Sequence, residues 1–282
     1  MIQLKSEREI ALMRQAGICV WQAHQLVAQM VAPGVTTAEI DAVIDEHFRH
    51  CGAEPLFKDY PHQNQGGPAF PAATCTSVNE EVVHGIPTHR QLVEGDVVSV
   101  DTGCRVNGWC GDSAMTYPAG PIAPAVQKLL DVTKGTLEMA FELMHTKTRW
   151  SQIAREMAQY VRDNGFSTVE CFVGHGIGRQ MHEEPQVPNF LSRSLRGSGD
   201  FHIEPGLVIA VEPMVNMGTK RVKMMRDHWT QSTLDRKPSA HFEHTIAVTK
   251  DGPWLLTAAP TPEEVANLPW EASASKPVST RS

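Results

Sequence analysis

Two segments of this chain share a pattern that ends in an acidic residue. Gly95–Asp101 and Gly206–Glu212 each place an apolar, strand-like run between a glycine and a carboxylate. A His-Gly pair precedes each segment, at His84 and at His175. A carboxylate at the end of a buried strand is costly unless a cation pairs with it. The repetition therefore predicts a duplicated fold that is built around one metal site.

A hairpin is expected to bring a further acid close to Asp101. Asn107-Gly108 separates Asp101 from Asp112 and is the strongest short hairpin signal. If these two residues form the turn, Gly103 pairs with Asp112, and the two acids lie on one face, roughly 7–8 Å apart at the backbone. A shift of one residue would put them on opposite faces. The alternative interpretation is a pair of solvated acids on an edge hairpin.

Other residues favour the metal site over solvated acids. Glu212 ends an apolar run, Glu243 stands before another, and His175 lies between glycines. Four carboxylates and one imidazole suit two divalent first-row ions, Mn, Fe, Co or Zn, better than a metal that needs only thiolates. Paired ions about 3.5–4 Å apart activate a bridging water and polarise a carbonyl. The residues thus indicate metal-assisted hydrolysis.

The elements around these residues occur in the same order twice. Capping boxes at Ser6 and Thr36 begin two helices, and strand-like runs follow up to Tyr117. A long apolar helix pattern from Val126 and a second helix capped at Ser151 then precede further strand-like runs. This order predicts an α+β fold with helices packed on a mostly antiparallel sheet.

The domain organisation follows from the same repeat. We expect one catalytic domain over residues 1–258, with pseudo-repeats at about 1–118 and 119–258. Residues 259–282 are rich in Pro, Ser, Ala and Thr, which predicts a flexible C-terminal tail. The segment Pro61 to Ala73 is rich in Pro, Gly, Gln and Asn and is expected to be a long loop.

Composition excludes several classes of protein. The chain has 282 residues and a net charge of -7, so DNA is not an expected partner. Its longest apolar run, Leu207 to Val211, is too short to span a bilayer, and no membrane partner is expected. The beginning does not resemble a signal peptide, and the six cysteines show no CxxC spacing. These features favour the cytoplasm.

The motifs resemble those of type I methionine aminopeptidases, which are pita-bread metallopeptidases, from about Ile2 to Thr257. The resemblance implies a duplicated pita-bread fold with an antiparallel sheet, two helix pairs on it and a dinuclear metal site between the halves. The motifs that carry it are Asp101, Asp112, Gly-His175-Gly-x-Gly, Val-Glu212-Pro, Glu243-His244-Thr, Asn79-Glu80-x3-His84-Gly85-Ile86-Pro87, Gly176-Ile177-Gly178-Arg179-x2-His182-x2-Pro185 and Asp227-His228-Trp229-Thr230.

The resemblance also implies a ligand set for the two divalent ions. Asp101 would chelate one ion, and His175 with Glu212 would hold the other. Asp112 and Glu243 would bridge both. Sequence alone does not choose among Co, Mn, Fe and Zn.

The same resemblance implies catalytic and pocket residues. Glu212 would take a proton from the attacking water, and His84 and His182 would lie over the metals near the scissile amide. A bridging hydroxide would attack the carbonyl and release the N-terminal methionine of nascent proteins whose second residue is small. The family's usual pocket tyrosine is replaced by Phe70, in a loop that is longer than usual. The expected pocket residues are Phe70, Cys75, His84, Met181 and Trp229.

Two other functions compete with this one. A non-catalytic relative that only binds protein or RNA is disfavoured because all five ligand positions are filled. Proline-directed and creatine-type hydrolases normally carry a large preceding domain, for which this chain has no room. The expected partners are nascent polypeptide N-termini, and the enzyme is expected to be a monomer. One basic segment is either a solvated loop or a docking site for ribosomal RNA: Lys220, Arg221, Lys223 and Arg226.

Overall fold

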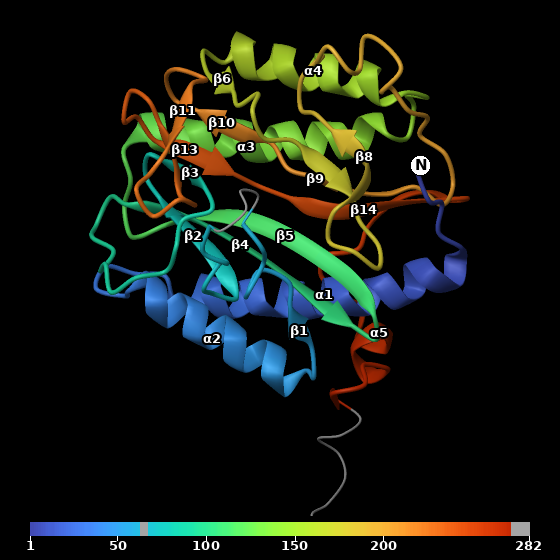
Figure 1. Cartoon of the computed structure of the whole chain (residues 1–282), viewed down its shortest axis with the longest axis horizontal. Helices are drawn as coiled ribbons and strands as arrows, with labels where there is room; N and C mark the ends of the chain where they lie inside the picture. The colour runs from blue at the N-terminus through green and yellow to red at the C-terminus, as the bar shows by residue number, and fades with distance from the viewer. Residues whose placement is uncertain (63–66, 272–282) are drawn as a thin grey trace, which may run out of the picture.

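The computed structural model describes residues 1–62 and 67–271. Helices α1 (Glu7–Met30) and α2 (Thr37–His50) lie in the lower half of the molecule in Figure 1, and α3 (Pro124–Leu143) and α4 (Trp150–Asp163) lie in its upper half. The predicted capping boxes are present, because the Ser6 and Thr36 side chains accept from the backbone N–H of Glu9 and Glu39. The predicted two helix pairs are therefore confirmed.

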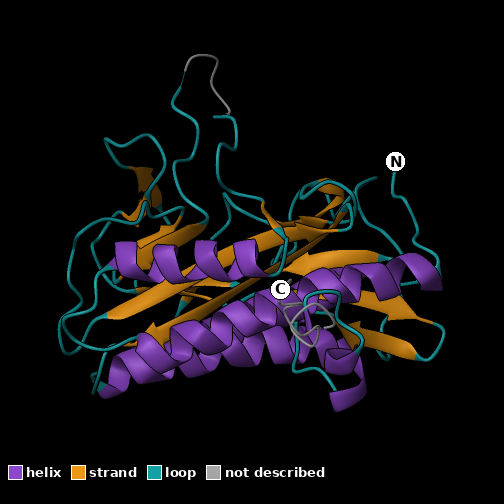
Figure 2. Cartoon of the chain, turned by 90° about the horizontal axis from the view of Figure 1, so that it is seen from below, coloured by secondary structure: helices purple, strands orange, loops and turns teal. Residues whose placement is uncertain are grey.

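The strands of the described residues form antiparallel sheets between the helix pairs, and Figure 2 shows the long strands edge-on. The first half contributes a sheet in the order β1-β4-β2, with β5 on the other edge of β4, and the second half a sheet in the order β15-β14-β9-β7-β8. Smaller sheets have the orders β13-β10-β6 and β11-β12-β3. The predicted α+β class is confirmed. The strands are β1 (Glu54–Pro55), β2 (Thr74–Val78), β3 (Glu81–Val83), β4 (Val97–Val106), β5 (Trp109–Pro118), β6 (Ser167–Thr168), β7 (Gly174–Gly176), β8 (Glu183–Val187), β9 (Val208–Val211), β10 (Met214–Asn216), β11 (Val222–Met224), β12 (Gln231–Thr233), β13 (Ser239–His241), β14 (His244–Thr249) and β15 (Gly252–Leu255).

The β4–β5 hairpin has the predicted register. Asn107 and Gly108 form the turn with φ of 51° and 79°, the left-handed backbone that an Asn-Gly turn requires. Gly103 pairs with Asp112, and Asp101 pairs with Ala114. Because side chains alternate along a strand, Asp101 and Asp112 share one face of the sheet.

Each helix pair covers its own strands with a separate core. The first core joins α1 and α2 to β4 through buried residues such as Ile18, Phe48 and Val100. The second joins α3 and α4 to β9 and β14, with the Trp150 ring stacked on Phe201 at 5.9 Å. A third core lies between them and contains several residues of the predicted pocket. The two halves thus meet at an apolar layer, and the site lies in that layer.

The prediction of a flexible end from residue 259 is wrong for residues 262–270. Helix α5 (Pro262–Ala266) is followed by the buried side chains of Leu268 and Trp270, which pack into the first core. Arg14 of α1 holds this segment, because its guanidinium donates to Glu264 at 2.7 Å and to the carbonyls of Leu256 and Ala258. Residues 272–282 of the predicted tail lie outside the described residues.

His24 in the first core makes stability depend on pH. Its Nε2 lies 3.0 Å from the Ser113 carbonyl oxygen and its Nδ1 lies 2.9 Å from the Tyr117 hydroxyl. Burial lowers its pKa from 6.5 to about 4. Between pH 6.5 and pH 4, His24 is therefore protonated in the unfolded chain but neutral in the folded chain. Acidification through this range lowers the free energy of unfolding.

We expect the His24→Gln variant to lose less stability on acidification than the wild type. Between pH 6.5 and 4, the difference should be about 3 kcal/mol of unfolding free energy, because one pKa unit corresponds to about 1.4 kcal/mol. Urea unfolding at a series of pH values measures it. His50, an exposed histidine at the end of α2, is the matched control for substitution by glutamine. Identical pH slopes for wild type and His24→Gln would contradict the assignment.

No helix within the described residues is long and apolar enough to cross a membrane.

Candidate metal centre

All predicted site residues line one cavity with an empty volume of about 530 Å³, which includes its open mouth. They come from both halves of the chain, since Asp101 and Asp112 lie on β4 and β5, and His175 lies on β7. Glu212 directly follows β9, and Glu243 directly precedes β14. Phe57 and Tyr60 line the same cavity and were not predicted. The predicted residues that line it are Phe70, Cys75, His84, Asp101, Asp112, His175, Met181, His182, Glu212, Trp229 and Glu243.

Hydrogen bonds between β5 and the start of β14 bring Asp112 and Glu243 together. The Thr245 hydroxyl accepts from the Asp112 N–H at 3.1 Å and donates to the Asp112 carbonyl at 2.8 Å. One step along, the Glu243 N–H donates to the Ala114 carbonyl, and the Ser113 hydroxyl donates to the Glu243 carbonyl. These bonds join the two halves, so the spacing of the backbone segments that carry the two carboxylates is fixed by hydrogen bonds rather than by the carboxylates themselves.

Gly103 leaves the space that the Asp112 carboxylate occupies. A Cβ atom at position 103 would lie 2.8 Å from Asp112 Oδ1, closer than a side chain can approach. The pairing partner of Asp112 must therefore be a glycine for the carboxylate to keep this rotamer.

His175 presents a lone pair to the carboxylates. Its Nδ1 lies 3.0 Å from the Gly176 carbonyl oxygen, which can only accept, so Nδ1 carries the proton. Nε2 therefore faces Glu212 Oε1, 3.7 Å away, as an unprotonated nitrogen. A backbone hydrogen bond of this kind fixes the tautomer of a metal-binding histidine. Burial and the neighbouring His182 lower the pKa of His175 to about 3. His175 is therefore neutral, and its approach to Glu212 is not an ion pair between an imidazolium and a carboxylate.

The carboxylates are buried close to one another, and no Lys or Arg of residues 1–62 and 67–271 forms an ion pair with them. Asp101 Oδ1, Asp112 Oδ1 and Glu243 Oε1 are buried and have no hydrogen-bond partner within the described part of the chain. Burial raises the pKa of Asp112 to about 7, and burial together with repulsion from Asp112 raises the pKa of Glu212 and Glu243 well above the ordinary value. Asp101 shows the same shift from burial and from Asp112 and Glu212. Divalent cations would remove both the repulsion and the missing contacts.

The donor atoms fit such cations in type and in spacing. One ligand atom each from Asp112, His175 and Glu243 lies within 4.8 Å of the others. Carboxylate oxygens with one imidazole nitrogen suit Mn, Fe, Co or Zn. The residues of this site therefore fit the metal ions that the sequence implied.

His241 is a polar neighbour of the site that was not predicted. Its side chain is 1 % exposed, and its Nε2 lies 3.7 Å from Glu212 Oε2 and has no hydrogen-bond partner among the described residues. It thus approaches the Glu212 oxygen that His175 does not approach. The signal in the sequence was its place two residues before Glu243, which puts the two side chains on the same side of an extended chain.

Two histidines lie around the cavity mouth. His182 is exposed, and its ring lies 4.3 Å from the ring of His175. The Tyr60 hydroxyl, which sequence reasoning missed, lies 2.7 Å from His182 Nδ1. His84 has a left-handed backbone with φ of 59°, and its ring lies edge-on to Phe172 at 5.3 Å and to Trp229 at 6.3 Å. Burial lowers the pKa of His84 to about 4.

Apolar and sulfur-bearing side chains form the wall of the cavity beside the carboxylates. Phe70 is 2 % exposed and lies edge-on to Trp229 at 5.3 Å. The Trp229 indole N–H donates to the Pro68 carbonyl at 2.9 Å, which holds this ring against the loop. Cys75, Met181 and Phe57 complete the wall. Such polarisable groups suit a thioether side chain.

The known proteins whose sequences resemble this chain are metallopeptidases. Residues 11–250 match metallopeptidase family M24. The chain is 44% identical over 257 residues to a methionine aminopeptidase from Clostridium perfringens, which covers 91% of this chain and 99% of that one. It is 42% identical to methionine aminopeptidase 1 from Bacillus subtilis, with the same coverage.

Solved structures agree. A methionine aminopeptidase from Thermotoga maritima aligns with a TM-score of 0.85 and 37% identity, over 92% of this chain and 100% of that one. A prolidase from Pyrococcus furiosus has a TM-score of 0.71 at 17% identity, over 92% of this chain and 66% of that one, and shows the fold alone. The predicted pita-bread fold is confirmed.

Proposed function

The chain belongs to metallopeptidase family M24 as a methionine aminopeptidase, and from that premise we propose that it acts on nascent proteins whose second residue is small. It removes the N-terminal methionine by metal-dependent hydrolysis of the first peptide bond. The observation that carries the proposal is the cluster of buried acids and His175 beside an apolar wall in one open cavity.

We propose the following ligands for two divalent ions, Co, Mn, Fe or Zn. Asp101 would hold one ion, and His175 and Glu212 would hold the other. Asp112 and Glu243 would contribute to holding both ions. Such a pair of ions supplies an activated water and polarises the scissile carbonyl. The whole set comes from one catalytic domain, in which residues 1–118 and 119–258 are the two pseudo-repeats.

The side chains around the ions carry out the proton transfers. Glu212 takes a proton from the attacking water, and His241 Nε2 lies 3.7 Å from its other oxygen, Oε2. His182 stands at the mouth with its Nδ1 held by Tyr60, so its Nε2 is free to donate to the developing oxyanion. His84 stands beside Trp229 as a neutral imidazole that donates a hydrogen bond toward the scissile amide, and the proton held by Glu212 passes to the leaving amine.

The methionine side chain occupies the apolar wall. Phe70, Cys75, Met181 and Trp229 receive the thioether, with Phe57 behind them. The rings of Phe70 and Trp229 pack edge to face at 5.3 Å and bound the space for this side chain.

A peptide series Met-X-Ser tests the substrate class. His84 and His182 both line the cavity and would narrow the space for the second residue, so we expect cleavage when X is Gly, Ala, Ser, Thr, Cys, Pro or Val and resistance when X is larger. The kcat/KM for X = Ala should exceed that for X = Leu by at least about tenfold, the effect of a few methylenes in a closed site. An Ala-Pro peptide is the control for a prolidase. Equal kcat/KM for Ala and Leu would contradict the size limit, and preferential cleavage of Ala-Pro would contradict the function.

We also propose a cytoplasmic monomer that works on chains leaving the ribosome. All six cysteines are free thiols and five of them are buried, which suits a reducing compartment. The basic segment around β11 is exposed at Arg221, Lys223 and Arg226, while Lys220 pairs with Glu170 at 2.7 Å. This segment leads into Trp229, so a phosphate chain docked on it would lie next to the cavity mouth.

Ribosome co-sedimentation across a salt series tests the docking. Changing Lys220, Arg221, Lys223 and Arg226 to Ala should weaken binding and flatten its salt dependence, because fewer counterions are released. Cleavage of Met-Ala-Ser should not change. The matched control removes four exposed charges from the helices of the second half, Lys128, Lys134, Arg155 and Arg162. Equal loss in both variants, or in neither, would contradict docking by this segment.

A further inference from the structure

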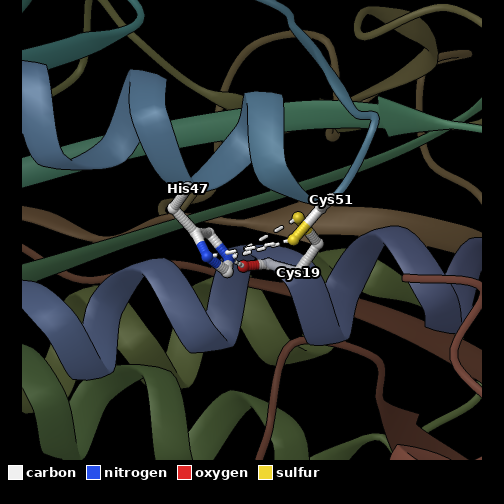
Figure 3. Close-up of side chains that lie close together, drawn as sticks. All are labelled: Cys19, His47 and Cys51. Atoms are coloured by element: carbon white, nitrogen blue, oxygen red, sulfur yellow. Dashed lines mark hydrogen bonds between the residues drawn. The ribbon is translucent and has the colours of Figure 1, made fainter. Parts of the chain in front are cut away.

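A second group of metal-binding side chains lies between α1 and α2, away from the residues that line the cavity. Cys19 projects from α1, His47 from α2, and Cys51 directly follows α2 (Figure 3). One ligand atom from each lies within 4.8 Å of the others. His47 and Cys51 are four residues apart, so they lie on the same side of α2 and face Cys19 across the helix interface.

The imidazole nitrogen is equidistant from the two thiols. His47 Nε2 lies 3.7 Å from Cys19 Sγ and 3.6 Å from Cys51 Sγ. A tetrahedral ion with metal–sulfur bonds of about 2.3 Å and metal–nitrogen bonds of about 2.05 Å separates its sulfur and nitrogen ligands by about 3.6 Å. The two distances from His47 Nε2 to sulfur are thus close to those that such an ion requires, and the two sulfur atoms lie within 4.8 Å of each other.

The surroundings are those of a structural site. Cys19 is 0 % and Cys51 is 7 % exposed, and both belong to the first core. The neighbouring Cys104 thiol of β4 raises the pKa of Cys19. Cys104 stands outside the group of three, and its thiol donates to the Ala16 carbonyl at 3.7 Å, so it would have to leave that contact to become a fourth ligand.

One contact favours a simpler interpretation. His47 Nε2 also lies 3.0 Å from the Cys19 carbonyl oxygen, which makes it a donor that links the two helices. That hydrogen bond accounts for the position of the His47 ring, but it does not account for the two thiols that lie close to the same nitrogen. Bound metal would take this nitrogen and leave the proton on Nδ1.

We propose that Cys19, His47 and Cys51 form a zinc site that holds α1 against α2, with Cys104 available as the fourth ligand. Thiolate with imidazole is a typical zinc ligand set. The ion would join the two helices that support β4, and with it Asp101, without entering the reaction.

Cobalt is the probe, because a thiolate bound to Co²⁺ gives a near-ultraviolet charge-transfer band that oxygen ligands do not give. The full chain, already holding cobalt in its catalytic centre, is titrated with further Co²⁺ and then with Zn²⁺. We expect the band to grow with one additional ion per chain and to disappear when Zn²⁺ displaces the cobalt. The Cys51→Ser and His47→Gln variants should bind this ion at least about tenfold more weakly. His47→Gln keeps a side chain that can donate to Cys19, so a variant that merely unfolds is avoided.

Controls separate this site from other thiols. The Cys75→Ser variant should keep the band, because Cys75 is the thiol that lines the catalytic cavity. His47→Gln should still cleave Met-Ala-Ser at the wild-type rate, which shows an intact fold. The proposal fails if the wild type shows no band, if the band survives both Cys51→Ser and His47→Gln, or if only Cys75→Ser removes it. It also fails if thiol counting on the unfolded chain finds two thiols fewer until a reductant is added, since Cys19 and Cys51 would then be a disulfide.

Discussion

The Asp112→Asn variant should lose almost all activity and bind less metal. We expect kcat/KM to fall by more than about 1000-fold, because a pair of ions supplies several kcal/mol to the transition state and a neutral amide cannot bridge them. Asparagine has the same shape, and the backbone bonds to Thr245 do not involve the carboxylate. The fold should therefore survive, and metal analysis of the folded variant measures the loss.

Stability of the metal-free proteins gives an independent check on Asp112→Asn. Asp112 raises the pKa of both Glu212 and Glu243 by repulsion, so removing its charge relieves a cost in the metal-free chain. The metal-free variant should unfold at a higher temperature than the metal-free wild type. Added metal should raise the unfolding temperature of the wild type more than that of the variant. The matched control is Asp131→Asn, an exposed acid on α3 that should change neither activity nor metal content. Full metal content with near-normal turnover in Asp112→Asn would contradict the bridging role.

The part of the site that could be predicted rests on local sequence. Asn107-Gly108 permits the turn that sets the register of β4 and β5, and that register alone places Asp101 and Asp112 on one face. The two repeated acidic strand ends indicated that a second pair of strands would face the first. Short-range rules were sufficient here, because turn geometry and strand alternation are local properties.

Other parts depend on contacts between distant segments, which a sequence pattern does not carry. Tyr60 contacts His182, which is 122 positions away in the sequence. Tyr60 lies in a loop, and a loop has no helical or strand periodicity from which the contact could be predicted. The composition of the C-terminal segment predicted a flexible tail. The structure instead has helix α5 there, because the buried guanidinium of Arg14 binds Glu264, which is 250 positions away in the sequence. Cys19 and Cys51 show no metal motif, since their convergence exists only once α1 packs on α2.

The Glu212→Gln variant should lower kcat by more than about 100-fold, the contribution of a positioned base. Glu212 is flanked by two imidazole nitrogens, His175 Nε2 and His241 Nε2, each 3.7 Å from one of its oxygens. Glutamine can fill the same space and can offer one oxygen as a ligand, but it cannot accept the proton of the attacking water. Steady-state cleavage of Met-Ala-Ser, with metal analysis on the same sample, measures the effect.

The two proposed roles of Glu212 can be separated by varying the metal supply. If the variant loses activity only because it binds an ion more weakly, added metal should restore kcat. If Glu212 is the base, kcat should stay low when both ions are present. His241→Gln is the companion variant, because it removes the imidazole that faces Glu212 Oε2 and leaves the ligands intact. It should lower kcat less than Glu212→Gln does. A metal-replete Glu212→Gln enzyme with normal kcat would refute the base role and leave Glu212 as a ligand only.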